Sequence, residues 1–150
     1  SPFSRKIIGF DAFGEFPKQK EQTDAKFIQE FEGVGGFGIS VEELETVFSH
    51  KSFKNYELIK GDIVDTIPEY ISEHPELKIA LLHVDVDVYA PSVTILENLF
   101  EKVVRGGLVV FDDYGTVSGE TRAVDDFFVG KGVQIEKLPI SHIPAYIRKK

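Results

Sequence analysis

The chain has 150 residues, of which 42% are hydrophobic and 28% charged, as in an ordinary globular domain with a sizeable core. Its net charge of −8 argues against a protein that binds nucleic acid through a basic face. There is no cysteine, which excludes disulfides, thiolate metal sites and a cysteine nucleophile. No apolar run approaches the roughly 20 residues of a membrane helix. Neither is there an export signal, so a cytoplasmic location is expected.

The first half of the chain is expected to alternate strands and helices. Ser40 and Glu43 fit a capping box, which predicts a helix from Val41 onward. Pro68 indicates a restart near the middle of the helix that contains it. The expected elements are a strand at 5–10, a loop at 11–24, a short helix at 25–32, a flexible glycine stretch at 33–38, a helix after Ser40, a strand at 56–60 and a helix at 63–74.

The second half continues this alternation and ends in a hairpin. Residues 78–86 are too apolar for a half-exposed strand, which predicts a central parallel strand. The pattern indicates an α/β fold, a mostly parallel sheet with a C-terminal antiparallel hairpin, in a single domain over residues 1–150. The expected elements are strands at 78–86 and 108–111, helices at 91–104 and 119–128, and terminal strands at 134–138 and 145–148.

Acidic residues follow every predicted parallel strand. Ligands of such sheets bind at the carboxyl ends of the strands. One Asp at a strand end often only caps a helix or turn, but carboxylates converging on one edge repel each other unless a cation or a proton compensates them. Oxygen-only ligation suits Mg²⁺, which can activate a hydroxyl for deprotonation by a neighbouring carboxylate and attack on an electrophilic methyl group. The residues concerned are Asp11, Asp62, Asp85, Asp87, Asp112 and Asp113.

Around these acids the chain resembles the macrocin O-methyltransferase (TylF-like) family of S-adenosylmethionine-dependent enzymes. The likeness rests on GFDAFGEFP (9–17), LIKGDIVDTIP (58–68), HVDVDVYAPSVTILENL (83–99), GGLVVFDDYG (106–115) and GETRAVDDFF (119–128). The resemblance implies a Rossmann-like class I methyltransferase sandwich and methyl transfer to a small-molecule hydroxyl, often on a sugar of a natural product. It also implies a Mg²⁺ site at Asp87, Asp112 and Asp113, with Asp85 as the general base.

The same resemblance implies where the cofactor binds. It places Asp11 near the ribose of S-adenosylmethionine and Asp62 near its adenine, with Asp85 also on the cofactor side. The family has a further strand and a glycine-rich turn before the Asp11 strand, and that strand lies between the Asp11 and Asp85 strands of its sheet. This sequence does not contain them, so the domain is expected to be N-terminally incomplete. The acceptor is the expected partner, without nucleic acid or membrane, and self-association into a homo-oligomer is compatible with the sequence.

Other motifs favour plainer interpretations. Gly33, Gly35 and Gly38 fit G-x-G-x-x-G, but a dinucleotide loop must follow a strand, and the segment before Gly33 is predicted to be helical. His83 lies inside an apolar strand, which favours a hydrogen-bonded core histidine over a metal ligand. The residues interpreted equally well as pocket lining or as packing and surface pairing are Tyr89, Tyr114 and Arg122.

Two rival functions stay open. The sequence HVDVDVY also fits the Asp-x-Asp of a glycosyltransferase that holds Mn²⁺ and a nucleotide sugar. The Asp-Asp pair on the next strand and the short C-terminal region argue against this rival. The other alternative is a non-catalytic partial domain that only binds metal or associates with itself.

Overall fold

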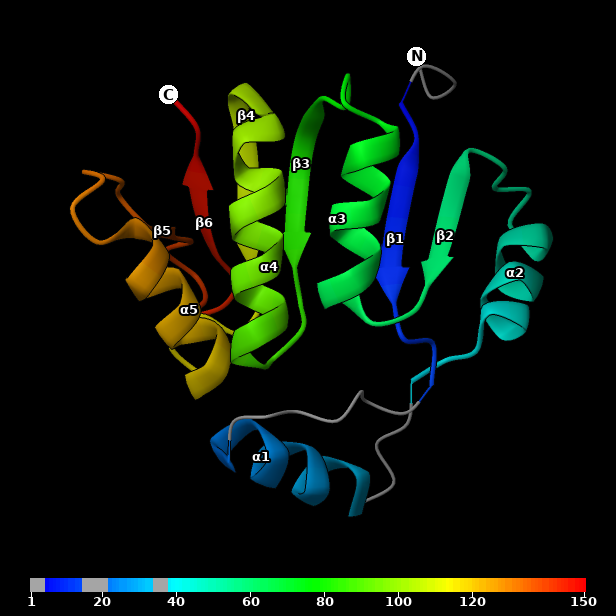
Figure 1. The fold of residues 1–150 in the computed structure, drawn as a ribbon, viewed down its shortest axis with the longest axis horizontal. Helices are drawn as coiled ribbons and strands as arrows, with labels where there is room; N and C mark the ends of the chain where they lie inside the picture. The colour runs from blue at the N-terminus through cyan, green and yellow to red at the C-terminus, as the bar shows by residue number, and fades with distance from the viewer. Residues whose placement is uncertain (1–4, 15–21, 34–37) are drawn as a thin grey trace. The chain divides into compact units, whose positions relative to one another are not determined.

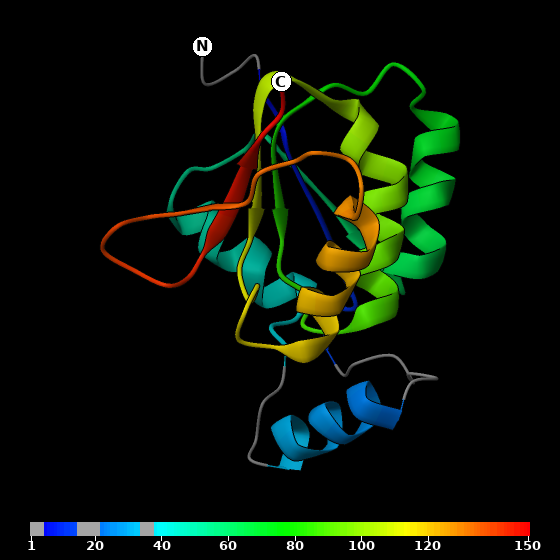
Figure 2. The same cartoon turned by 90° about the vertical axis from the view of Figure 1, so that its left-hand side faces the viewer.

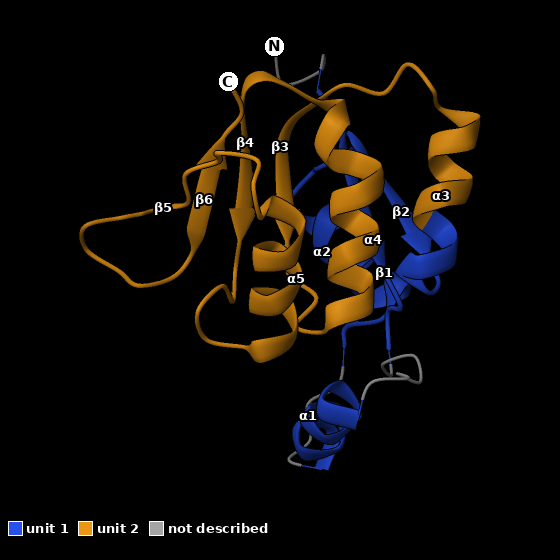
Figure 3. Cartoon of the chain, turned by 60° about the vertical axis from the view of Figure 1, so that its left-hand side comes forward, with its two compact units in different colours: residues 1–66 blue, residues 67–150 orange. Residues whose placement is uncertain are grey.

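The computed structural model describes residues 5–14, 22–33 and 38–150. The chain divides into two compact units, residues 1–66 and residues 67–150, which Figure 3 shows in different colours. The strands likewise form two separate sheets, of two and four strands. None of the helices in the described part of the chain has the length and apolar character needed to cross a membrane.

Unit 1 is built on two parallel strands. β1 (Ile7–Asp11) pairs with β2 (Tyr56–Lys60), with Ile7 opposite Tyr56 and Asp11 opposite Lys60. Between them in sequence are α1 (Gln22–Gly33) and α2 (Val41–His50). The capping box is confirmed, because the Glu43 amide donates to Ser40 Oγ and the Ser40 amide donates to Glu43 Oε2. Both predicted strands of this unit are confirmed.

The glycine-rich segment follows a helix, as the sequence predicted. Helix α1 begins at Gln22, earlier than expected, and ends at Gly33. Residues 34–37, including Gly35, lie outside the described residues. The Gly38 amide donates to the carbonyl of Gly14 (3.3 Å), and a Cβ added at Gly38 would lie 2.9 Å from that oxygen. Glycine at 38 therefore permits a close backbone approach to the turn after β1.

Helix α3 (Ile63–Glu73) runs through Pro68 without interruption, so the predicted restart is wrong. Proline removes one amide donor from the helix interior. The apolar face of α3 compensates, since Ile67 is 1% exposed and Tyr70 8% exposed. Burial of an amphipathic face supplies most of the stability of a helix in a folded protein, so it outweighs one missing hydrogen bond.

Unit 2 contains a four-stranded mixed sheet in the order β3-β4-β6-β5. β3 (Ile79–Val84) is parallel to β4 (Val103–Phe111), and β6 (Ala145–Arg148) is antiparallel to β4 and to β5 (Glu136–Lys137). The predicted C-terminal hairpin is therefore confirmed. The α/β class is also confirmed, with the strands of the expected sheet divided between two sheets.

Two helices cover one face of the sheet in unit 2. Figure 1 shows α4 (Tyr89–Leu99) in front of the sheet, and Figure 2 shows α5 (Ser118–Phe128) on the same side. The ring of Phe128 packs against the ring of Phe111, with centroids 6.3 Å apart. This layer buries the core of the unit, whose least exposed side chains include Val84, Val88, Leu96, Val109, Phe111, Val124 and Ile147.

The boundary between α4 and β4 differs from the prediction. Helix α4 ends at Leu99, a short 3₁₀ turn follows at Phe100–Lys102, and β4 begins at Val103. The pairing of β4 with β3 then shifts between Ile79 and Leu81, which is an irregularity that the positive φ of Gly106 (80°) accommodates. Because Val103 and Val104 are β-branched, they fit a strand better than the last turn of a helix.

Strand β3 is an edge strand and is half exposed, contrary to the prediction of a central buried strand. Leu82 and Val84 are buried, whereas Leu81 is 59% exposed and His83 is also exposed. The apolar sequence correctly predicted a strand. It did not predict exposure, because in the described part of unit 2 the helices α4 and α5 cover only one of the two faces that alternate along the strand.

Candidate functional site

The parallel pairing of β3 and β4 brings their acidic ends together. Val84 lies opposite Phe111, and the Asp112 amide donates to the carbonyl of Val84 (3.0 Å). The residues that follow the two strands therefore share one edge of the sheet. We call this set the β3–β4 acidic edge, and it consists of Asp85, Asp87, Asp112 and Asp113.

Asp87 lies at the centre of the β3–β4 acidic edge. Its side chain is hydrogen-bonded to that of Asp113. Burial, the charge and hydrogen bond of Asp113, and the charges of Asp85 and Asp112 together raise the pKa of Asp87 to about 7, with burial the largest cause. Its backbone has a φ of 62°, in the left-handed region that Asp tolerates better than most residues. The chain thus adopts an uncommon backbone conformation where it carries a carboxyl group into this edge.

Glu120 joins this edge from the first turn of α5, and the sequence interpretation did not include it. Its side chain is fully buried at 0% exposure. Oε1 accepts a hydrogen bond from the Asp113 amide (3.0 Å), whereas Oε2 is buried without a partner among the described residues. The pKa of Glu120 is raised to about 8, mainly by burial; the hydrogen bond from the Asp113 amide lowers it, and the charges of Asp113, Asp85 and Asp87 raise it. A carboxyl group in such surroundings favours its protonated form unless a cation is near.

His83 lies beside the same edge, and the prediction that it is a core histidine is wrong. Its side chain is 50% exposed, and Nε2 lies 3.2 Å from Asp112 Oδ1. One ligand atom each of His83, Asp85 and Asp112 lies within 4.8 Å of the others. The sequence held the relevant signal, because residues two apart on a strand face the same side, which places His83 and Asp85 together.

The donor set of this edge fits a divalent cation. Several carboxyl groups meet there, two of them with raised pKa values, and the buried Glu120 Oε2 has no hydrogen-bond partner in the described part of the chain. Carboxylate oxygens suit Mg²⁺, whereas an imidazole nitrogen suits transition metals better. The three residues that converge most closely include His83, whereas the predicted ligand set is Asp87, Asp112 and Asp113. The residues present are thus chemically compatible with a cation, and both metal binding and the identity of its ligands stay predictions.

The predicted cofactor-binding residues of unit 1 lie at the ends of adjacent parallel strands. Asp11 Oδ1 accepts from the Phe13 amide (2.5 Å), and Asp62 Oδ1 accepts from the Val64 amide (3.0 Å) at the start of α3. The Gly61 amide donates to the carbonyl of Asp11 (3.0 Å). These contacts are a turn and a helix cap. The roles of both aspartates at the cofactor stay predictions, and we call the pair the β1–β2 edge.

The two tyrosines near the β3–β4 acidic edge contact side chains of α5. The Tyr114 hydroxyl donates to Asp125 Oδ1 (2.8 Å), and its pKa is raised by burial and by this hydrogen bond. The Tyr89 hydroxyl donates to Asp126 Oδ2 (3.0 Å). The Arg122 guanidinium lies over the Tyr89 ring, 3.8 Å from its centroid. These contacts favour the packing and surface-pairing interpretation of the three side chains.

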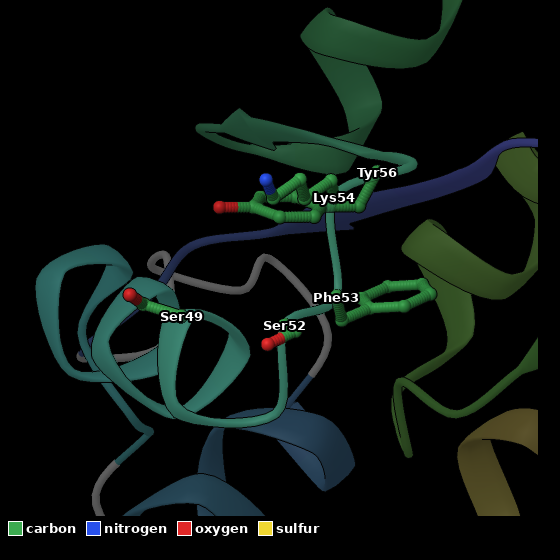
Figure 4. A pocket seen from close by; sticks show the side chains of 5 residues that line it. All are labelled: Ser49, Ser52, Phe53, Lys54 and Tyr56. Carbon is green, nitrogen blue, oxygen red and sulfur yellow. The ribbon is translucent and has the colours of Figure 1, made fainter.

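A separate surface depression lies in unit 1, at the turn between α2 and β2. Figure 4 shows its five lining residues, which are Ser49, Ser52, Phe53, Lys54 and Tyr56. None of the predicted site residues is among them. We therefore place the candidate chemistry at the strand ends and not in this depression.

Comparisons with known proteins identify the family of this chain. Residues 2–149 match the protein family described as Macrocin-O-methyltransferase (TylF). A curated relative, demethyldecarbamoylnovobiocin O-methyltransferase of Streptomyces niveus, is 33% identical over 84 residues, which cover 51% of this chain and 30% of the relative.

Solved structures show the same fold. The O-methyltransferase NovP superposes with a TM-score of 0.82 at 24% identity, covering 97% of this chain and 60% of NovP. Two structures of CalS11, a calicheamicin methyltransferase, also match. The first has a TM-score of 0.70 at 25% identity over 99% of this chain and 61% of CalS11. The apo form, described as a TDP-rhamnose 3'-O-methyltransferase, has a TM-score of 0.65 at 26% identity. The match covers 99% of this chain and 59% of that one. The chain therefore spans less than two thirds of the length of each of these relatives.

Proposed function

Because this chain belongs to the macrocin O-methyltransferase (TylF) family, we propose that it takes part in Mg²⁺-dependent methyl transfer from S-adenosylmethionine to a hydroxyl group of a small molecule. The observation that carries the proposal is the convergence of carboxyl groups at the ends of β3 and β4, where Asp87 meets Asp113 and Glu120 is buried behind them. Carboxyl groups that converge repel each other when ionised, so this arrangement would not stabilise an edge with a purely structural role.

The acceptor that we propose is a sugar hydroxyl of a natural product or of its nucleotide-sugar precursor. One related structure is of a TDP-rhamnose 3'-O-methyltransferase, and one curated relative methylates a novobiocin precursor according to its name. The similarity to these proteins supports the class of acceptor and leaves the methylated position open.

In this proposal the four aspartates of the β3–β4 acidic edge have two different roles. Asp87, Asp112 and Asp113 would hold the cation, and bound Mg²⁺ would supply orientation of the acceptor hydroxyl and a lower pKa for it. Asp85 is exposed, so a substrate can reach its carboxylate. Asp85 accepts the hydroxyl proton as the acceptor oxygen bonds to the methyl carbon. The bond from that carbon to the sulfonium sulfur breaks, and the sulfur leaves as a neutral thioether.

We propose cofactor contacts for each unit by itself. In unit 1, Asp11 would bind the ribose hydroxyls and Asp62 the adenine. In unit 2, Asp85 would lie on the cofactor side. Both unit 1 residues follow parallel strands, at the edge where ligands of such sheets bind. Each carboxylate also has a second oxygen beside the one that accepts the turn or cap hydrogen bond.

Calorimetric titration of the chain with S-adenosylmethionine, with and without Mg²⁺, tests the proposal. We expect saturable cofactor heat in the wild type and weaker Mg²⁺ binding in Asp112→Asn. The matched control is Glu97→Gln, which removes one charge from an exposed position of α4. This variant should change neither the cofactor heat nor the Mg²⁺ affinity. A folded wild-type protein that binds neither ligand would refute the proposal. Heat with a nucleotide sugar and Mn²⁺ but none with S-adenosylmethionine would favour a glycosyltransferase.

A further inference from the structure

Glu120 connects the two loops that carry the β3–β4 acidic edge. Its backbone amide donates to the carbonyl of Asp87 (3.0 Å), in the loop between β3 and α4. Its side-chain Oε1 accepts from the amide of Asp113 (3.0 Å), in the loop between β4 and α5. One residue at the start of α5 is thus bonded to the backbone of both aspartates whose side chains meet.

The rest of the geometry around these loops shows that both aspartates are held by their backbones. The Thr116 and Val117 amides donate to the carbonyl of Asp113 (2.8 and 3.0 Å), whereas Glu120 is bonded to the amide of that residue. Asp87 has a positive φ of 62°, so its conformation needs support from the surrounding structure. The Glu120 amide supplies a hydrogen bond at the carbonyl of that residue.

The buried side chain of Glu120 destabilises the fold, which argues against a merely structural role. The side chain is 0% exposed, and its Oε2 has no hydrogen-bond partner among the described residues. Burial of an unpaired polar atom destabilises the folded state, and carboxyl groups nearby add repulsion. Residues that break a local rule at such a cost are expected at functional sites.

We propose that Glu120 is a positioning residue that sets the separation of the Asp87 and Asp113 carboxyl groups and thereby the affinity of the edge for a divalent cation. The inference rests on the proposed cation site at these aspartates and adds to it a residue that acts through the protein backbone. Glu120 is not proposed as a ligand of the cation. The length of the Glu120 side chain, and not its charge, determines its effect on the affinity for the cation.

Substitutions at 120 separate reach from charge. Glu120→Gln keeps the length of the side chain and an acceptor oxygen for the Asp113 amide, but removes the charge. Glu120→Asp keeps the charge and shortens the side chain by one methylene, so that it no longer reaches the amide. Glu120→Ala removes both properties. Glu97→Ala is the matched control, because it removes an exposed glutamate from α4 of the same unit.

Two measurements on the full chain test the inference. Amide hydrogen exchange without metal should show a protected Asp113 amide in the wild type and in Glu120→Gln, with protection lost in Glu120→Ala and Glu120→Asp. Calorimetric titration with Mg²⁺ should show affinity about 10–100-fold weaker in the Ala and Asp variants, as for other residues that orient metal ligands. The Mg²⁺ affinity of the Gln variant should stay within about threefold of the wild-type affinity. The Glu97→Ala control should have the affinity of the wild type.

The outcomes distinguish this inference from the proposed function. Wild-type binding of Mg²⁺ with equal affinity in Glu120→Ala would overturn the positioning role alone. Weak binding in Glu120→Gln with normal binding in Glu120→Asp would also overturn it, because charge would then be the property that matters. A folded wild type that does not bind Mg²⁺ would overturn both. If Glu120→Ala does not fold, the comparison of the Gln and Asp variants decides.

Discussion

The carboxyl ends of the parallel strands in the two units carry the same residue type in different surroundings. At the β1–β2 edge, the side chains of Asp11 and Asp62 each accept a hydrogen bond from a backbone amide two residues further on. At the β3–β4 acidic edge, the carboxyl group of Asp87 meets that of Asp113, and the charges of Asp85 and Asp112 act on it as well. An Asp after a strand is therefore ambiguous until its hydrogen-bond partner is known.

The difference follows from the number of acids that each strand supplies. One Asp follows each strand of unit 1, and the next turn can satisfy it. In unit 2 the parallel strands β3 and β4 are each followed by two acids, in Asp-x-Asp and in Asp-Asp, and α5 adds Glu120. The backbone amides of the turns cannot satisfy all of these oxygens, and Glu120 Oε2 is left without a partner among the described residues. Such an excess of carboxyl groups favours a cation.

The largest expected effect comes from removing a carboxylate at one edge and not at the other. Asp112→Asn should weaken Mg²⁺ binding by on the order of 100-fold, at least as much as the loss of a residue that only orients ligands. Asp11→Asn, the matched change in unit 1, should leave Mg²⁺ affinity unchanged. Calorimetric titration of both variants measures the difference. Equal losses in the two variants would remove the distinction between the edges.

The pH dependence of stability tests the raised pKa values at the β3–β4 acidic edge. The pKa values of Asp87 and Glu120 are raised from 3.8 and 4.5 to about 7 and about 8. Between those limits the folded state binds more protons than the unfolded state, so stability should fall as pH rises from about 4 to about 8 in metal-free protein. One pKa unit corresponds to about 1.4 kcal/mol, so the loss should amount to several kcal/mol, reduced by solvent screening at the partly exposed Asp87.

Glu120→Gln isolates the share of this pH dependence that belongs to Glu120. The variant cannot ionise at 120, so its urea midpoint should fall less than that of the wild type between pH 5 and pH 8. Excess Mg²⁺ should flatten the wild-type profile, because the cation stabilises the ionised carboxylates. A wild-type midpoint that rises with pH in metal-free protein would contradict the raised pKa values.

A smaller effect is expected at the helix cap of unit 1. Asp62→Ala removes the acceptor for the Val64 amide and should lower the free energy of unfolding by about 1 kcal/mol. Asp62→Asn should cost little, because Asn caps a helix as well as Asp. Urea denaturation of both variants tests this. If Asn proves as costly as Ala, the charge of Asp62 matters beyond its cap.

The smallest effect is expected near the surface of unit 2. Tyr89→Phe removes the hydroxyl that donates to Asp126 and should cost about 0.5 kcal/mol, the low end for one hydrogen bond. Mg²⁺ affinity should not change, because that hydroxyl points to α5. A clear loss of Mg²⁺ affinity in Tyr89→Phe would place Tyr89 in the cation site.

Local signals in the sequence predicted local structure well. The capping box at Ser40, the strand bounds of β2 and the C-terminal hairpin were all readable, because each depends on a few neighbouring residues. The continuity of α3 through Pro68 and the start of β4 at Val103 were not, since tertiary packing and strand pairing decide them. The acids at the strand ends were found from their order in the chain.

Two residues beside those acids were missed for different reasons. His83 was interpreted as buried because its strand is apolar, although its spacing from Asp85 already placed both on one face. Glu120 gives no signal in the sequence beyond an acid in the first turn of a helix. Its role depends on the distance from α5 to both loops, which only the folded structure shows.

The most direct test of the account is a Mg²⁺ titration of ¹⁵N-labelled protein followed by amide chemical shifts. A cation at the β3–β4 acidic edge predicts saturable shifts that are largest at residues 85–88 and 112–115, and their absence in Asp112→Asn. Folded protein in which neither loop responds to Mg²⁺ would contradict the assignment of a cation site to these aspartates.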